Sequence, residues 1–176
     1  MFAFFISREM DGLLMKIKTK RLIVERVRQQ NIIELTPLLK YQSLFQQAGL
    51  VTVGKVDLVV TLGMLAQTEC VLQIRERGER GLLGLIILLH SYDKTGAILP
   101  KQYEVGYLLL PQKQHQGYMT EALSAVCDQL SRSQITVTAE VRSDNTSSIG
   151  VLSRCNFIRT TINPEMIELW KRQDMG

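Results

Sequence analysis

A chain of 176 residues is long enough to bury one hydrophobic core without disulfides or a structural metal. Its composition, 45% hydrophobic and 22% charged residues, excludes an intrinsically disordered polymer. The formal net charge is +4, with a basic segment between Lys16 and Arg28, but no aromatic stacking motif accompanies that segment, so we interpret it as a solvated edge and expect no nucleic-acid partner.

The front of the chain predicts one strand and several helical pieces. Residues 21–27 are rich in β-branched side chains and suit a first strand. Residues 31–47 indicate two short helical pieces divided at Pro37. Between Val56 and Cys70 the apolar residues recur at three- and four-residue steps, which predicts a helix with one broad buried face.

The middle of the chain predicts a hairpin and a further strand. Residues 71–75 and 82–90 form the hairpin strands, with a glycine-containing turn at 78–81. Residues 103–110 alternate between two faces, and Pro111 ends the strand. One face carries Tyr103, Val105, Tyr107 and Leu109, and the other carries Glu104, Gly106, Leu108 and Leu110.

The last third of the chain predicts a helix, a strand, a shorter helix and a final hairpin. Apolar residues from Met119 to Leu130 follow the helical period, and residues 135–141 then alternate as a strand. A helix over 145–154 precedes hairpin strands at 157–162 and 166–171. Strand, helix and strand in this order indicate a right-handed crossover. The expected fold class is α+β, built around one curved sheet.

No repeat, low-complexity tract or Pro/Gly/Ser-rich linker divides the sequence, which predicts one domain. Met15 begins a segment that resembles a natural protein start. We therefore interpret residues 1–14 as an N-terminal appendage of uncertain structure and residues 15–176 as the domain.

Cysteine usage and hydropathy point to a reducing compartment. The cysteines, Cys70, Cys127 and Cys155, are odd in number and form no Cys-x-x-Cys pair, which argues against disulfides and a zinc site. The longest apolar run, residues 82–89, is too short to span a bilayer. Charges from Arg8 onward interrupt the apolar N-terminus before a signal-peptide core forms. We expect a cytoplasmic protein with no metal and no membrane partner.

A strand, a polar loop and a helix meet between Pro111 and Ala122. Such a junction directs several backbone N–H groups at one point, and the helix dipole adds partial positive charge, which suits a phosphate. Gly117 lacks the Cβ that would block a pyrophosphate, and Lys113 and His115 offer charge or hydrogen bonds. From these residues alone, an ordinary loop and helix start is an equally good interpretation.

Further motifs lie at characteristic spacings along the chain. They are Glu104-Val-Gly-Tyr107, Gln114-His-Gln-Gly-Tyr-Met-Thr-Glu-Ala122, Asn145-Thr-Ser-Ser148 and Arg154-Cys-Asn-Phe157. Together they resemble the GNAT acyltransferase superfamily, and most closely its Rim-type branch, which acetylates ribosomal-protein N-termini. Thr19-Lys-Arg-Leu22 is similar to the start of the family's first strand, so the resemblance covers nearly all of the chain from Lys18. Met119 departs from the family pattern, which usually has a small residue there.

The resemblance implies a single GNAT-type domain with a mixed, curved and splayed sheet flanked by helices, and acetyl-CoA as the acyl-donor cosubstrate. In the family, the strand matching residues 103–110 splays from its neighbour near a bulge. The pantetheine arm pairs with the backbone exposed there, and an N–H near Leu109 stabilises the oxyanion. The cofactor-binding residues implied are Leu108, Leu109, Leu110, Gln114, His115, Gln116, Gly117, Tyr118, Met119, Thr120 and Asn145.

Acetyl transfer to an amine needs a neutral amine, a stabilised oxyanion and a protonated or hydrogen-bonded leaving thiolate. Glu104 is the candidate acceptor of the amine proton, directly or through water, and an exposed strand carboxylate is an equally good interpretation of it. Glu140 is a second option on the polar face of its strand, for which simple solvation is the better interpretation. The resemblance assigns Asn145 to the pantetheine arm and Ser148 to the leaving sulfur. Helix capping is an alternative role for Asn145.

Other reactive side chains receive structural interpretations. Cys155 has no His/Asp partner pattern, so we interpret it as a core residue. Tyr107 and Tyr118 are possible proton donors but are interpreted as packing or loop residues.

The leading hypothesis is an N-acetyltransferase acting on a protein N-terminus, a small amine or an amino sugar. We expect the acceptor pocket to be built from residues 30–56 and a loop at 91–102. One alternative is a non-catalytic acyl-CoA-binding regulatory module of the same fold. Another is a nucleic-acid-associated protein that uses the basic front. Exposed hairpin edges at the C-terminus would permit a homodimer.

Overall fold

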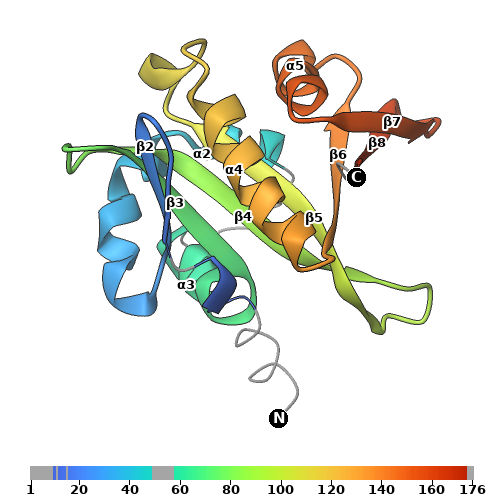
Figure 1. Cartoon of the computed structure of the whole chain (residues 1–176), viewed down its shortest axis with the longest axis horizontal. Helices are drawn as coiled ribbons and strands as arrows, with labels where there is room; N and C mark the ends of the chain where they lie inside the picture. Colours follow the sequence, from blue (N-terminus) through green and yellow to red (C-terminus); the bar gives the residue numbers. More distant parts are fainter. Residues whose placement is uncertain (1–9, 11, 15, 49–57, 174–176) are drawn as a thin grey trace.

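A computed structural model describes residues 10, 12–14, 16–48 and 58–173 of the chain. Its strands form one open mixed sheet in the order β1-β2-β3-β4-β5-β6-β8-β7 (Figure 1). Strands β5 and β6 pair in parallel, whereas the other neighbouring strands pair antiparallel. The strands are β1 (Lys16–Lys18), β2 (Leu22–Arg26), β3 (Cys70–Glu76), β4 (Leu82–Tyr92), β5 (Ile98–Leu109), β6 (Thr136–Arg142), β7 (Phe157–Ile162) and β8 (Ile167–Arg172).

Helices cover both faces of this sheet, which confirms the expected α+β class. In Figure 1, α4 crosses one face, and α3 lies on the opposite side of the strands. The helical elements are η1 (Gln29–Lys40), α2 (Gln42–Gln47), α3 (Leu58–Thr68), η2 (Pro111–Lys113), α4 (Tyr118–Arg132) and α5 (Thr146–Arg154). In the part of the chain that the structure describes, no helix is long and apolar enough to cross a membrane.

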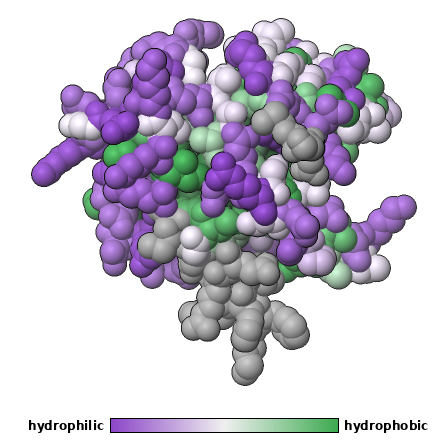
Figure 2. Space-filling view, viewed as in Figure 1, coloured by the Kyte–Doolittle hydropathy of each residue, from purple (hydrophilic) through white to green (hydrophobic). Residues whose placement is uncertain are grey.

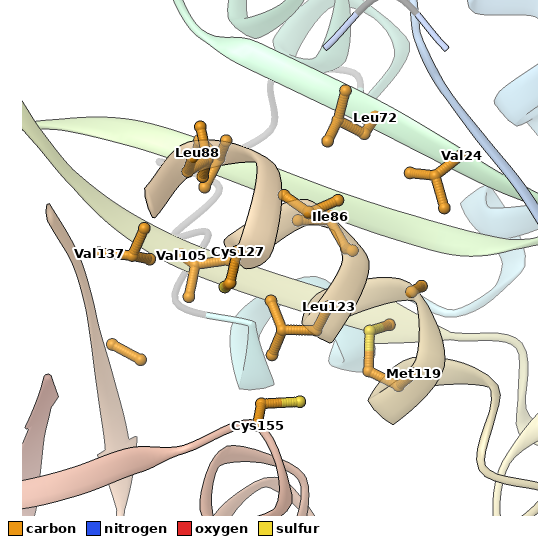
Figure 3. Packing of buried hydrophobic residues seen from close by; sticks show 14 of the residues in the cluster. Val24, Leu72, Ile86, Leu88, Val105, Met119, Leu123, Cys127, Val137 and Cys155 are labelled. Atoms are coloured by element: carbon orange, nitrogen blue, oxygen red, sulfur yellow. The ribbon is translucent and has the colours of Figure 1, made fainter. Parts of the chain in front are cut away.

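The alternation of β5 divides the hydrophobic core into two clusters. Val105 and Leu109 belong to the cluster that contains the buried face of α4. Leu108 and Leu110 belong to the second cluster, with side chains from η1 and α2 such as Phe45. Figure 3 shows α4 lying across the strands with its apolar side chains directed at the sheet. Successive residues of one strand therefore anchor helices on opposite faces.

Helix α4 forms because its sequence is amphipathic. Its buried residues recur every three or four positions and end at Leu130: Tyr118, Met119, Ala122, Leu123, Val126, Cys127 and Leu130. Figure 2 shows the molecule from the same side as Figure 1, the side on which α4 lies, and most of the surface seen there is hydrophilic. The helix predicted from Met119 is confirmed.

The sequence-based prediction was wrong about where the first helical segment breaks. Pro37 lies inside η1, and the break falls at Tyr41 instead. A 3₁₀ segment consists of short turns, so a proline without an N–H removes one bond and does not end the segment. The residues predicted as a loop over 91–102 are also mostly strand, because β4 and β5 continue to a tight turn around Asp93.

The N-terminal side of the chain contributes to the core. Met10 and Leu14 are buried in the cluster that contains α4. Residues 1–9, 11 and 15 lie outside the described residues, so the predicted boundary between an appendage and the domain at residue 15 stays a prediction.

Strands β5 and β6 share only a short ladder. Their register pairs are Gln102 with Thr136, Tyr103 with Val137, and Glu104 with Thr138. Beyond Glu104, β5 continues to Leu109 beside β4, while β6 continues beside β8. Figure 1 shows the two strands diverging from this point. The expected splay is confirmed. The β4–β5 register is regular along it, and the irregularity beside it lies in the β3–β4 pairing, between Ile74 and Arg75, next to Gly84, the register partner of Leu109.

Gly106 allows α2 to approach β5. A Cβ at this position would lie 2.4 Å from the carbonyl oxygen of Ala48, just after α2. We expect Gly106→Ala to lower the free energy of unfolding by about 1–3 kcal/mol, because backbone must move to make room. Gly81→Ala is the control, since nothing lies within 4 Å of its Cβ position. Urea denaturation of both variants measures the difference, and equal stabilities would contradict this account of α2 docking.

Candidate active site

The divergence of β5 and β6 leaves backbone groups of β5 facing a gap. The Leu110 N–H donates to Leu83 O at 2.8 Å, which sets the alternation of hydrogen bonds between β4 and β5. By that alternation, Leu108 bonds toward β4, while Tyr107 and Leu109 direct their N–H and C=O groups away from it. Consistently, Gln114 Nε2 donates to Leu109 O at 3.1 Å. The gap therefore offers an extended ligand main-chain partners on β5.

A cavity of about 420 Å³ opens at this gap, between β5, the start of α4 and α5. It brings together most of the residues predicted from the sequence. Those that line it are Leu108, Leu109, Gln114, His115, Gly117, Tyr118, Met119, Thr120, Asn145 and Ser148. The strand, the polar loop and the two helices thus converge on one site, as the motif spacing predicted.

The start of α4 has the geometry of an anion-binding site. Gly117 caps the helix in the left-handed region, at φ +76°, where a side chain would be strained. The first hydrogen bond of the helix is Glu121 N–H to Gly117 O, at 3.1 Å. The N–H groups of the preceding turn have no acceptor within the helix and point along its axis, where the dipole favours negative charge.

Glu121 fastens this helix start to the first strands. Its carboxylate accepts from the Thr19 hydroxyl at 2.5 Å, from the Arg21 N–H at 2.8 Å and from Arg21 Nε at 2.6 Å. The Arg21 guanidinium also donates to Gln116 O and lies 4.5 Å from the centre of the Tyr118 ring. Burial alone would raise the pKa of Glu121, but these bonds and the Arg21 charge hold it below its usual range.

Part of the positive charge between Lys16 and Arg28 is paired with carboxylates. Arg21 pairs with Glu121, and Lys16 pairs with Glu25 at 3.4 Å. The motif at residues 19–22 therefore positions the loop before α4.

Helix α5 forms the opposite wall of the cavity. Asn145 caps it, because its side-chain oxygen accepts from the Ser148 N–H at 3.1 Å. The Tyr107 hydroxyl reaches across the gap and donates to Ser148 O at 3.1 Å. Burial raises the pKa of Tyr107, so this hydroxyl keeps its proton and the bridge from β5 to α5 persists at neutral pH.

Glu104 lies where the β5–β6 ladder ends and does not line the cavity itself. Its register partner is Thr138, so its side chain shares a face with Glu140, two residues further along β6. Burial, together with the negative charge of Glu140, raises the pKa of Glu104. A half-buried carboxylate with a raised pKa is suited to exchange protons near neutral pH.

The cysteines are core residues, as predicted for Cys155. Cys70, Cys127 and Cys155 are free and buried. Burial raises the pKa of Cys127 to about 12 and that of Cys155 to about 11, so neither thiol ionises readily. Within the described ranges, no group of His, Cys, Asp and Glu side chains is arranged to hold a metal ion.

Some predicted site residues lie outside the cavity lining. Leu110 is one of them: its N–H donates to Leu83 O, and its C=O accepts from the Lys113 N–H. Gln116 does not line the cavity, and its side chain donates to Gln112 O. Lys113 lies 3.7 Å from Glu76 and lines a second depression instead.

The predicted acceptor-pocket segments contribute little to this cavity, and where an acceptor binds stays a prediction. The hairpin over 91–102 contributes no lining residue to the cavity, whereas Leu44, from the predicted segment 30–56, does. Residues 49–57 of that segment lie outside the described residues. The sequence reasoning also missed Thr146, Ser147, Gly150, Val151 and Arg154, which line the α5 wall. Helical spacing from Thr146, in steps of four residues, would have found Gly150 and Arg154 on one side of that helix.

Comparisons with known proteins identify a family and a fold. The acetyltransferase (GNAT) domain family matches residues 52–158, more than half of the chain. No curated protein sequence matches significantly. A GNAT-family acetyltransferase from Bacillus anthracis superimposes with a TM-score of 0.71 at 16% identity, over 91% of this chain and 99% of its own.

Two further solved structures are similar in fold. A ribosomal-protein-serine acetyltransferase from Vibrio cholerae gives a TM-score of 0.64 at 19% identity, over 89% of this chain and 95% of its own. RimL, a ribosomal-protein alpha-N-acetyltransferase in complex with coenzyme A, gives 0.68 at 17% identity, over 89% and 97%. At these identities the likeness concerns the fold.

Glu121→Gln tests the attachment of α4 to the first strands. A neutral amide loses the ion pair with Arg21 and one acceptor, so we expect unfolding free energy to fall by about 1–2 kcal/mol near neutral pH. Because the pKa of Glu121 is depressed, its contribution is complete above the ordinary value of 4.5 and is lost as pH falls through the folded value. The Tm gap between wild type and variant should therefore narrow in acid.

The control is Glu79→Gln, in the exposed turn after β3. Thermal melts across the acid range measure both variants. If the Tm of Glu121→Gln equals that of wild type at neutral pH, or if the Tm difference grows in acid, the role assigned to Glu121 is contradicted.

Proposed function

Because the chain belongs to the GNAT acetyltransferase family, with acetyl-CoA as acyl donor, we propose that it transfers the acetyl group directly to an amine. The observation that carries this proposal is the cavity at the β5–β6 gap. Its lining combines the N-terminus of α4, free backbone groups of β5 and the cap of α5, and no described lining residue is acidic. Such a site favours a long anionic ligand with an extended, amide-containing arm.

Each part of the donor has a matching part of the site. The N–H groups around Gly117 and Met119 would hold the diphosphate. The backbone of Tyr107 would pair with the pantetheine amides, in the way that one strand pairs with another, which leaves the Leu109 N–H for the thioester carbonyl. Asn145 lies at the opposite wall and would contact the same arm. When bound there, acetyl-CoA supplies an activated thioester at the inner end of the gap.

Glu104 is the proposed general base. A protonated amine cannot attack a carbonyl, so a group near the end of the gap must accept its proton. Glu104 lies at the last β5–β6 pair, and its raised pKa matches that task. The Leu109 N–H would donate to the carbonyl oxygen as negative charge develops on it.

Ser148 is the proposed donor to the leaving sulfur. It lies one turn into α5 and lines the cavity. Its N–H is bonded to Asn145 and its C=O to Tyr107, which fixes the backbone and leaves the hydroxyl to act. A hydroxyl within reach of the departing thiolate lowers the cost of breaking the C–S bond.

For the acceptor we propose a primary amine, with a protein N-terminus as the first class to test. RimL, whose fold is similar, is described as an alpha-N-protein acetyltransferase. Incubation with acetyl-CoA and a panel of N-terminal peptides, small amines and amino sugars, followed by mass spectrometry and thiol detection, tests this proposal. An acetylated amine supports it. Tight acetyl-CoA binding without acetylation of any class would overturn it in favour of a non-catalytic binding module.

The acid limb of the rate profile tests the role of Glu104. Activity should rise with pH as Glu104 loses its proton, and Glu104→Gln should lower kcat by roughly 100-fold or more. Glu140→Gln removes a negative charge that raises the Glu104 pKa, so the limb should move to lower pH. Glu165→Gln, in the exposed turn before β8, is the control. If the acid limb of the pH–rate profile lies at the same pH in Glu140→Gln as in wild type, the assignment of Glu104 as the base is contradicted.

We further propose a cytoplasmic protein, supported by three free, buried cysteines. A homodimer through the C-terminal hairpin is proposed because β7 is an edge strand with Ile158 and Ile162 about half exposed. Sedimentation velocity of wild type and Ile162→Lys tests the dimer, and a wild-type monomer at high concentration would overturn it.

A further inference from the structure

Arg154 is the one permanently charged side chain among the described residues that line the cavity. It lies in the last turn of α5, on the wall opposite the start of α4. Its Nε is 3.4 Å from the Thr120 hydroxyl, so its guanidinium lies beside the first turn of α4. No carboxylate among the described residues pairs with it. Its positive charge is therefore directed at the cavity and at solvent.

The Arg154 guanidinium lies over Gly150 on the same helix. Side chains of a helix lean toward its N-terminus, so Arg154 extends back over the residue four positions earlier. A Cβ at Gly150 would lie 3.4 Å from one terminal nitrogen and 3.5 Å from the other. These are ordinary van der Waals distances, so the guanidinium packs directly over the backbone of α5 at Gly150 while its Nε faces Thr120.

The start of α4 and the Arg154 guanidinium offer an anion two different kinds of donor. The first is a cluster of backbone donors beside Gly117, which is sufficient for a diphosphate without any side chain. The second is an exposed cation beyond Thr120, at the rim of the cavity. A planar guanidinium binds a terminal phosphate through two parallel bonds, and a doubly charged group at the rim can stay partly hydrated.

Coenzyme A carries one phosphate of that kind, on the 3′ carbon of its ribose, besides the diphosphate. We propose that Arg154 binds the 3′-phosphate of the donor and makes the protein prefer CoA over 3′-dephospho-CoA. This inference rests on the use of acetyl-CoA at the cavity. It adds a residue that selects the donor, and it concerns binding only, since no bond of the 3′-phosphate changes.

The test compares two ligands across matched variants by calorimetric titration. Wild type should bind CoA roughly tenfold more tightly than dephospho-CoA, the size expected for one charge-assisted contact. Arg154→Gln should weaken CoA binding by a similar factor and leave dephospho-CoA binding unchanged. Arg154→Lys should restore part of the preference, because it keeps the charge. Arg132→Gln, in the last turn of α4 and outside the cavity lining, is the control.

The outcomes separate the inference from the function on which it rests. Equal losses for both ligands in Arg154→Gln would mean that Arg154 acts on the diphosphate or on the fold, and would overturn the inference. Equal binding of both ligands by wild type would overturn it as well. Failure of wild type to bind either ligand would instead overturn the donor site itself. Thermal melts of each variant identify any loss that comes from unfolding.

Discussion

The early end of the β5–β6 ladder is the constraint on which the rest of the site depends. Backbone N–H and C=O groups need partners, and inside a sheet the neighbouring strand supplies them. Here β6 leaves β5 after Glu104, so the next residues of β5 face a gap instead of a strand. The gap stays open because Tyr107 spans it and donates to Ser148 O on α5. Unsatisfied main-chain groups at the gap would be costly in a closed core, but they are useful where a ligand with amides can replace the missing strand.

The start of α4, where the diphosphate is proposed to bind, is held in place by side-chain contacts to the first strands. Gly117 adopts a conformation that directs the first N–H groups of α4 at the cavity. Glu121 then ties that helix to the first strands through Thr19 and Arg21, contacts that join residues about 100 positions apart in the sequence. The Arg21 charge is paired with the Glu121 carboxylate, whereas Arg154 lines the cavity and has no carboxylate partner among the described residues. Two arginines at one end of the site thus act differently, one on structure and one on the ligand.

Periodicity predicted the regular parts of the fold, and motif spacing predicted most of the lining residues. Helix α4 and the two faces of β5 follow from local patterns of burial, which a sequence displays directly. The failures concern what a sequence does not display. Leu110 lies outside the cavity lining, and the direction of its N–H depends on strand register. Helical spacing would have placed Arg154 on the side of α5 that carries Thr146 and Gly150, but its contact with Thr120 depends on how α5 packs against α4. Whether Glu104 acts as the base depends on its distance from the bound amine. Neither the sequence pattern nor the burial of Glu104 gives that distance.

The central claim is that the cavity between the start of α4 and the splayed strands binds acetyl-CoA. Calorimetric titration of wild type and Gly117→Asp with acetyl-CoA, with circular dichroism to confirm folding, tests this claim most directly. At residue 117 a carboxylate would repel the diphosphate and strain the left-handed backbone. The account predicts micromolar binding by wild type and no measurable binding by the folded variant. Equal affinities in the two proteins, or no binding by wild type at high ligand concentration, would contradict it.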